Sequence, residues 1–229
     1  MPKNTRWIIC FDFETDSPDR ETCNPVQLAA VPIDPETLEV KKDQSFNIII
    51  KPDGINKEDY LTEQREKTIQ WHADNYGVSF EEVLDKWKTG VTEKVAWKNF
   101  STWCSKYTVD KKPGQWFPQP IPAGYNITGF DIPIAKRLCD KHKIKMPFSE
   151  VTKLDAMDNL FWWFENLEEP FDYKMDTWRK FFNMKATGVA HDALIDVLEE
   201  AAIITRFMKF HRKQSSIEKF KNSFKDVEI

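Results

Sequence analysis

The sequence has few of the residues that build metal fingers, disulfide scaffolds or membrane spans. Its four cysteines, Cys10, Cys23, Cys104 and Cys139, lie far apart with no C-x-x-C pair, and there are only four histidines. A structural zinc site or a disulfide framework is therefore not expected. No apolar run approaches the roughly 18 residues of a membrane helix, and no leader-like segment opens the chain. These absences predict a cytoplasmic protein with reduced thiols.

The sequence also lacks the excess of positive charge that nucleic-acid-binding proteins usually carry. There are 33 basic against 37 acidic residues, a formal net charge of -4, whereas affinity for phosphate normally rests on a basic surface. The distribution is uneven, because residues 206–225 hold seven Lys or Arg against Glu218 alone. This run is either a solvated helix face or a surface that attracts phosphate.

Aromatic residues are abundant by contrast, with nine tryptophans and seventeen phenylalanines in 229 residues. They predict a dense aromatic core, with a few rings left to stack on bases. The length favours a single domain over residues 1–229, with its core from about 5 to 210 and a basic C-terminal extension from about 206 to 229.

The apolar pattern predicts an α/β protein. Strands are expected at 7–14, 26–33, 46–50, 121–125 and 151–154, and helices at 62–76, 80–87, 92–107, 129–141, 159–164, around Trp178 and at 192–211. The proline-rich stretch before residue 122 predicts an ordered loop. Because strands come first and then alternate with helices, we expect a mixed five-stranded sheet with helices on both faces.

Two acids interrupt the first strand. Asp12 and Glu14 are two residues apart, so their side chains leave the same face of an otherwise apolar strand. Two neighbouring buried carboxylates repel each other, and a divalent cation would compensate them. A D-x-E pair alone is weak evidence, since most such pairs are solvated at a strand end.

A third acid lies where a strand is expected to give way to a helix. Asp131 falls in the first turn of that helix, where a carboxylate complements the helix dipole, and Asn126 fits a turn. The functional interpretation instead places Asp131 at the carboxyl edge of the sheet beside Asp12.

The last candidates stand at the start of the final helix. Asp196 interrupts the apolar run from Ala193 to Leu198, and His191 lies just before the helix. Such a histidine is more often a cap or a surface residue, but here its ring could also reach a site that Asp196 borders.

In their order and spacing these three segments resemble the motifs of the DEDDh 3′–5′ exonucleases, a family with a ribonuclease-H-like fold. Phe11–Thr15 resembles the first motif, Asn126 with Phe130 and Asp131 the second, and His191 with Asp196 the third.

The subtype follows from the third motif. The related tyrosine-type enzymes would have Tyr four residues before the last aspartate, where this sequence has Asp192. The segment Thr68–His72 is most similar to phage exonuclease A and exodeoxyribonuclease VIII-like members. Gln27 departs from the pattern, because many relatives have an acid there.

The resemblance implies a two-metal mechanism. Asp12, Glu14, Asp131 and Asp196 would bind two Mg²⁺ or Mn²⁺ ions, and His191 would take the proton of the attacking water. Phosphodiester bonds would be hydrolysed from the 3′ ends of single-stranded DNA or RNA, with release of 5′-mononucleotides. Thr15, Asn126 and Phe130 would hold the terminal nucleotide, although Phe130 also suits a core position.

Two other functions are compatible with part of the pattern. Asp12–Thr15 superficially resembles the D-x-D-x-T motif of haloacid-dehalogenase phosphatases, with Glu14 in place of the second Asp. That chemistry gives no reason for the spacing of His191 and Asp196. A non-catalytic nucleic-acid-binding protein on the same fold is the other alternative.

Overall fold

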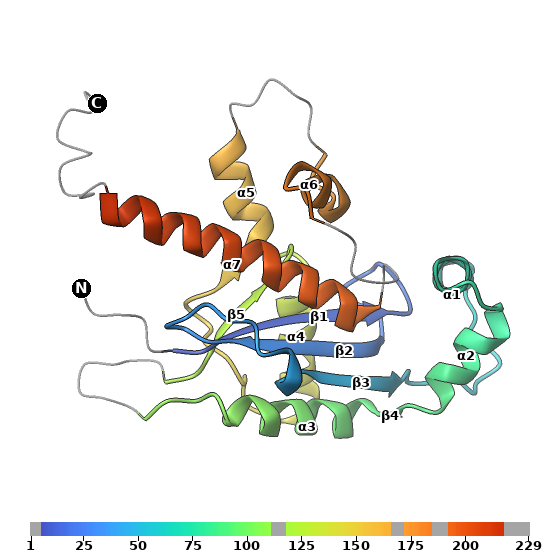
Figure 1. Ribbon diagram of the computed structural model, residues 1–229. Coiled ribbons are helices and arrows are strands. Elements are labelled where there is room, and N and C mark those ends of the chain that lie inside the picture. The colour runs from blue at the N-terminus through green and yellow to red at the C-terminus, as the bar shows by residue number, and fades with distance from the viewer. Residues whose placement is uncertain (1–5, 111–117, 166–171, 185–191, 218–229) are drawn as a thin grey trace.

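The sheet is the frame on which every other element packs. The computed structural model describes residues 6–110, 118–165, 172–184 and 192–217 (Figure 1). Six strands pair in the order β4-β3-β2-β1-β5-β6. Their bounds are β1 Ile8–Thr15, β2 Pro25–Ile33, β3 Phe46–Lys51, β4 Val91–Thr92, β5 Ile121–Gly124 and β6 Leu154–Asp155. The first three strands form an antiparallel meander, and the other three pairings are parallel.

Helices cover both faces of the sheet. The long helix α7 (Ala193–Ile217) crosses one face, and α3 (Glu93–Ser105) and α4 (Asp131–His142) pack on the other (Figure 1). The pair α1 (Glu63–Tyr76) and α2 (Phe80–Lys88) stands at the end of the sheet where β1 finishes. Helices α5 (Ala156–Phe164) and α6 (Met175–Phe181) lie on the outer side of α7, and a short 3-10 helix spans Lys42–Gln44.

Strand β1 lies between two hydrophobic cores, because its side chains alternate between the two faces of the sheet. Ile9, Phe11 and Phe13 point toward α3 and α4, into a cluster of stacked and tilted rings. Ile8 and Cys10 point toward α7. Since successive side chains of a strand alternate, Asp12 and Glu14 continue the α7 side. The carboxylates therefore follow directly on an apolar interface.

The predicted mixed sheet with helices on both faces is confirmed, but the strand count is wrong by one. The sequence predicted five strands, and β4 was missed because two residues carry no periodicity. Val95 was expected on the apolar stripe of α3, yet it is 45% exposed, and Ala96 and Trp97 are buried instead. Helix α7 also runs beyond His211 to Ile217.

Two further observations concern the cysteines and the apolar character of the helices. All four cysteines are free thiols. None of the described helices combines the length and the apolar character needed to cross a bilayer.

The aromatic core generates a stability prediction. Phe100 is fully buried, and its ring contacts those of Phe11 and Phe46. Phe100→Ala should lower the free energy of unfolding by about 3–5 kcal/mol, because it removes these contacts and leaves a cavity. Val95→Ala, on the exposed side of the same helix, is the control and should change it by less than about 0.5 kcal/mol. Urea unfolding measures both, and equal effects would contradict the assigned core.

Candidate active site

Three carboxylates from distant parts of the chain meet at the end of β1. One carboxylate oxygen from each of Asp12, Glu14 and Asp196 lies within 4.8 Å of the other two. The strand presents the first two on its α7 side, and the first turn of α7 brings Asp196 over them. The spacing within β1 and the position of Asp196 in α7 are both consequences of the sequence. Their meeting depends on how the helix packs across the sheet.

Asp131 lies beside this group, at the edge of β1 that faces β5. The parallel pairing of β1 with β5 extends only to Cys10, so the backbone N–H of Phe13 has no partner on β5. It donates instead to Asp131 Oδ1 at 3.0 Å. Asp131 is 2% exposed and is the first residue of α4, as the sequence predicted for a residue of the first turn. This hydrogen bond fixes the carboxylate against the strand that carries Asp12.

The negative charges of these carboxylates favour the binding of a positively charged ligand. Burial raises the pKa of Asp12 well above its usual range, and repulsion from Asp131 and Asp196 raises it further. Burial and Asp12 do the same to the pKa of Glu14, and burial raises the pKa of Asp131 to about 8. In the part of the chain that the structure describes, no Lys or Arg lies within ion-pair distance of Asp12 or Glu14. An all-carboxylate donor set of this kind fits hard divalent cations such as Mg²⁺ or Mn²⁺.

A further buried acid was missed by the sequence analysis. Glu200 lies one helical turn beyond Asp196 on α7 and is 4% exposed. Its Oε2 accepts a hydrogen bond from Cys10 Sγ at 3.7 Å, and burial followed by repulsion from Asp12 raises its pKa well above the usual range. The signal was present, because residues four apart in a helix share a face. Glu200 is a further acid whose ionisation the neighbouring carboxylates oppose, and it does not belong to the three gathered oxygens.

A groove of about 1130 Å³ opens beside Glu14. Thr15 and Phe130 form part of its wall, and helix α1 supplies the opposite side, including Arg65 and Trp71. The indole of Trp71 is 43% exposed. The carboxylate group therefore borders an open space with both polar and aromatic walls.

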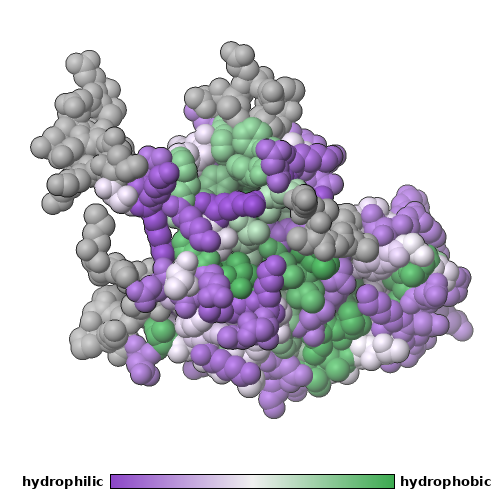
Figure 2. All heavy atoms as spheres, in the orientation of Figure 1, coloured by the Kyte–Doolittle hydropathy of each residue, from purple (hydrophilic) through white to green (hydrophobic). Residues whose placement is uncertain are grey.

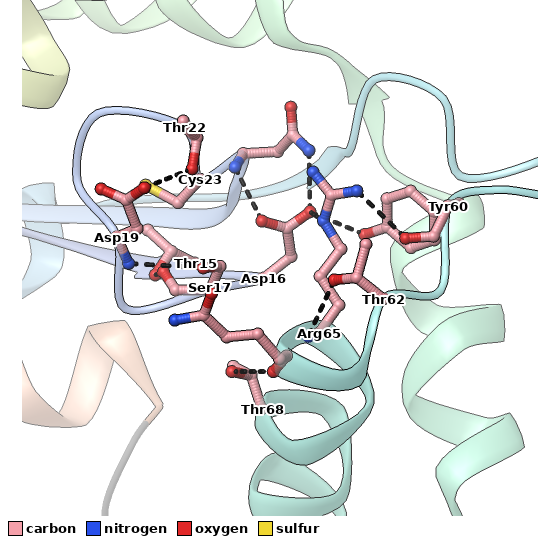
Figure 3. A network of polar contacts seen from close by, with 12 residues as sticks. Thr15, Asp16, Ser17, Asp19, Thr22, Cys23, Tyr60, Thr62, Arg65 and Thr68 are labelled. Carbon is pink, nitrogen blue, oxygen red and sulfur yellow. Dashed lines mark hydrogen bonds and ion pairs between the residues drawn. The ribbon is translucent and has the colours of Figure 1, made fainter.

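A buried network fixes α1 at this groove (Figure 3). Asp16 is fully buried, and its carboxylate accepts hydrogen bonds from the backbone N–H and the side chain of Asn24, both at 2.7 Å, and from the Tyr60 hydroxyl at 2.9 Å. The Nε of Arg65 forms an ion pair with it at 3.0 Å. Arg65 also donates through its backbone N–H to the N-cap side chain of Thr62. One carboxylate thus joins β1, β2 and the first turn of α1.

The residues predicted to hold a nucleotide are only partly brought together. Thr15 and Phe130 line the groove, with the Thr15 hydroxyl donating to the carbonyl of Ser17 at 2.7 Å. Asn126 occupies a left-handed turn, with φ of 56°, and donates its backbone N–H to Asp155 Oδ1 at 2.9 Å. It is not among the residues that line the groove. His191 lies outside the described residues.

The raised pKa values generate a prediction for stability against pH. Without a divalent cation, the folded protein retains protons on these carboxyls that the unfolded chain, with pKa values near 4, releases. The free energy of unfolding should therefore fall as the pH rises toward the folded pKa of Asp131, about 8. Urea unfolding in EDTA between pH 5 and pH 8 measures this slope.

Asp131→Asn is the matched variant for that measurement. Its amide oxygen still accepts from the Phe13 N–H, but the titrating group is gone, so the slope should become shallower. Stability that rises over this pH range in the unsubstituted protein would contradict the electrostatics described above.

Comparison with known proteins finds similarity in structure. No protein-family model matches the chain, and no curated protein matches it. The nuclease domain of 3′hExo, a DEDDh family member bound to rAMP, superimposes with a TM-score of 0.65 at 14% identity, covering 92% of this chain and 95% of that domain. Cell-death related nuclease 4 gives 0.64 at 19% identity, covering 90% of this chain and 64% of that protein.

A third structure is the zinc-bound complex of E. coli exonuclease I with single-stranded DNA. It gives a TM-score of 0.66 at 18% identity and covers 93% of this chain. The chain spans only 43% of that protein's length. The predicted similarity to phage exonuclease A and exodeoxyribonuclease VIII stays a prediction. At these identities the comparisons establish the architecture, and the chain has the ribonuclease-H-like fold of these nucleases.

Proposed function

We propose that the protein is a divalent-metal-dependent 3′–5′ exonuclease of the DEDDh type. The observation that carries the proposal is the meeting of Asp12, Glu14 and Asp196 within 4.8 Å, with Asp131 fixed alongside by Phe13. These four carboxylates correspond in order and spacing to the metal-binding motifs of the family. Their position on a fold shared with known nucleases supports the same chemistry.

The four carboxylates would hold two Mg²⁺ or Mn²⁺ ions. When bound, such ions supply the positive charge that acidifies a water molecule and stabilises the leaving oxygen. Asp131 is held by a backbone N–H and Glu14 stands near the buried His72, so these ligands are fixed before any ion arrives. The fixed donor set reduces the reorganisation that the reaction requires.

His191 would act as the general base. An imidazole with a pKa near neutrality can take the proton of the attacking water and release it to solvent. The residue stands one position before Asp192, and the Asp192 side chain accepts a hydrogen bond from the backbone N–H of Leu194 at 3.0 Å. That bond caps the first turn of α7 and anchors the chain next to the proposed base.

The groove beside Glu14 would receive the 3′-terminal nucleotide. Phe130 and Trp71 offer ring surface for a base, and Thr15 and Arg65 offer polar groups for sugar and phosphate. Asn126 would act from the adjacent turn. A terminal nucleotide must leave its stack to enter such a groove, which favours single-stranded DNA or RNA as the substrate.

The proposal predicts a metal-dependent ladder that shortens from the 3′ end. Purified protein would be incubated with 5′-labelled single-stranded DNA and RNA in Mg²⁺, Mn²⁺ or EDTA. Asp12→Ala and Asp196→Ala should abolish hydrolysis, because each removes a metal ligand. His191→Ala should retain the rise in melting temperature caused by Mn²⁺ but lose about 10²–10⁴ in rate, the usual contribution of a general base.

Glu81→Ala is the control, because Glu81 is an exposed acid of α2 remote from the carboxylate group. Full turnover by the Asp12→Ala protein would refute the assignment. Binding of oligonucleotides without hydrolysis in any metal would favour a non-catalytic nucleic-acid-binding protein on the same fold.

A further inference from the structure

A second concentration of exposed rings lies on α5, away from the groove. Trp162 is 78% exposed, Phe161 50% and Trp163 39%, although large aromatic side chains are normally withdrawn from water. Phe210 of α7 is 45% exposed. Contiguous exposed apolar area of this kind marks a binding surface more often than a free one.

Ring contacts join α5 to the second half of α7. Trp163 meets Phe210 at 5.3 Å between ring centroids and His211 at 4.5 Å, both edge to face. Figure 2 shows a hydrophobic area over α5 directly beside hydrophilic side chains along α7. The rings of Trp163 and Phe210 therefore lie side by side, and Trp162 is the neighbouring exposed ring on α5.

Another set of contacts leads from this surface back toward the active site. The ring of Phe161 lies 6.3 Å from that of Tyr173, which is 48% exposed. The carbonyl of Tyr173 accepts a hydrogen bond from the Tyr125 hydroxyl at 2.6 Å. Tyr125 directly follows β5 and precedes Asn126. These contacts connect Phe161 to the turn that holds Asn126.

The positive charge on this surface comes from α7. Arg206 and Lys213 are exposed and lie four residues before and three residues after Phe210, so they share its side of the helix. The single acid of α6, Asp176, does not offset them, because it is paired with Arg179. On α5 the exposed acids Asp158 and Glu165 lie four residues before and three residues after Trp162, so they share the side of that ring, and among the described residues the cations of the surface lie on α7 alone.

We infer that Phe161, Trp162, Trp163, Arg206, Phe210 and Lys213, here called the α5/α7 face, bind the single strand of a polynucleotide on the 5′ side of its terminal nucleotide. Bases stack on exposed rings irrespective of sequence, while neighbouring cations hold the phosphates. A duplex has no free base faces for such rings. This inference rests on the proposed function and adds the path of the substrate outside the active site.

The length of α7 sets the size of the substrate concerned. Phe210 follows Asp196 by fourteen residues, or about 21 Å along the helix. At the roughly 3.4 Å spacing of stacked nucleotides, a strand needs on the order of six nucleotides to reach from the carboxylates to Phe210. Shorter oligonucleotides should therefore not contact the α5/α7 face.

The binding experiment uses the full chain in EDTA and fluorescence anisotropy with a labelled sixteen-nucleotide oligothymidylate. Trp162→Ala should weaken binding about tenfold, the size of one stacking contact, and Trp162→Phe should restore it. Combined Arg206→Gln and Lys213→Gln should lower the dependence of log Kd on log salt by about 1.4, or about 0.7 for each phosphate contact. Lys98→Gln, at an exposed position of α3 on the opposite side of the sheet, is the charge control and should change nothing.

A kinetic experiment with Mn²⁺ separates this inference from the proposed function. Trp162→Ala should raise KM for the sixteen-nucleotide substrate about tenfold and leave a four-nucleotide substrate unchanged. If the unsubstituted protein binds through the face but hydrolyses neither substrate, the inference stands and the exonuclease proposal fails. If both substrates are hydrolysed with the same KM by Trp162→Ala and the unsubstituted protein, the inference is overturned and the exonuclease proposal stands. Occupation of the face by a second copy of the chain, seen as a dimer that Trp162→Ala dissociates, would also overturn it.

Discussion

Carboxylates repel one another at the end of β1, and the surrounding structure must hold them together against this repulsion. Asp12, Glu14 and Asp196 approach one another within 4.8 Å, and Asp131 and Glu200 add charge from α4 and α7. Without a cation this arrangement opposes folding, since each carboxylate leaves water for a region that already holds others. The remainder of the fold must therefore be stable enough to hold the strand and the helices in place.

That stability comes from the opposite side of the same strand. Phe11 and Phe13 alternate with the two acids and enter a core of packed rings that includes Trp97 and Phe100. Dispersion and apolar burial on this side offset electrostatic cost on the other. The fully buried Asp16 plays a related role at the end of the strand, because its four polar contacts keep α1 beside the groove. In β1, residues that stabilise the fold and residues that strain it alternate from Phe11 to Glu14.

The sequence predicted the parts of this site that depend on local structure, and it did not predict the contacts between segments far apart in the chain. The shared orientation of Asp12 and Glu14 follows from the two-residue period of a strand, and the position of Asp131 follows from the local signals of a helix start. The contacts of Asp16 with Tyr60 and Arg65 join segments more than forty residues apart. Local sequence patterns do not predict such contacts. Strand β4 was missed for a different reason, because two residues cannot show a period. His191, the residue that selects the subtype, lies outside the described residues, so its part in the site still rests on resemblance.

Helix α7 connects the chemistry of the site to the rest of the molecule. Its first turns supply Asp196 and Glu200 and pack Val197 and Ala201 on the sheet, and its second half exposes Phe210 among basic side chains. A single rigid helix therefore sets the distance between the carboxylates and the exposed rings of α5. Because that distance is fixed by covalent geometry rather than by a loop, a strand bound along the helix would meet the carboxylates at a constant register. The basic residues of α7 lie outside the carboxylate group, so in the proposed function they would attract phosphate without neutralising the charge that bound metal ions would require.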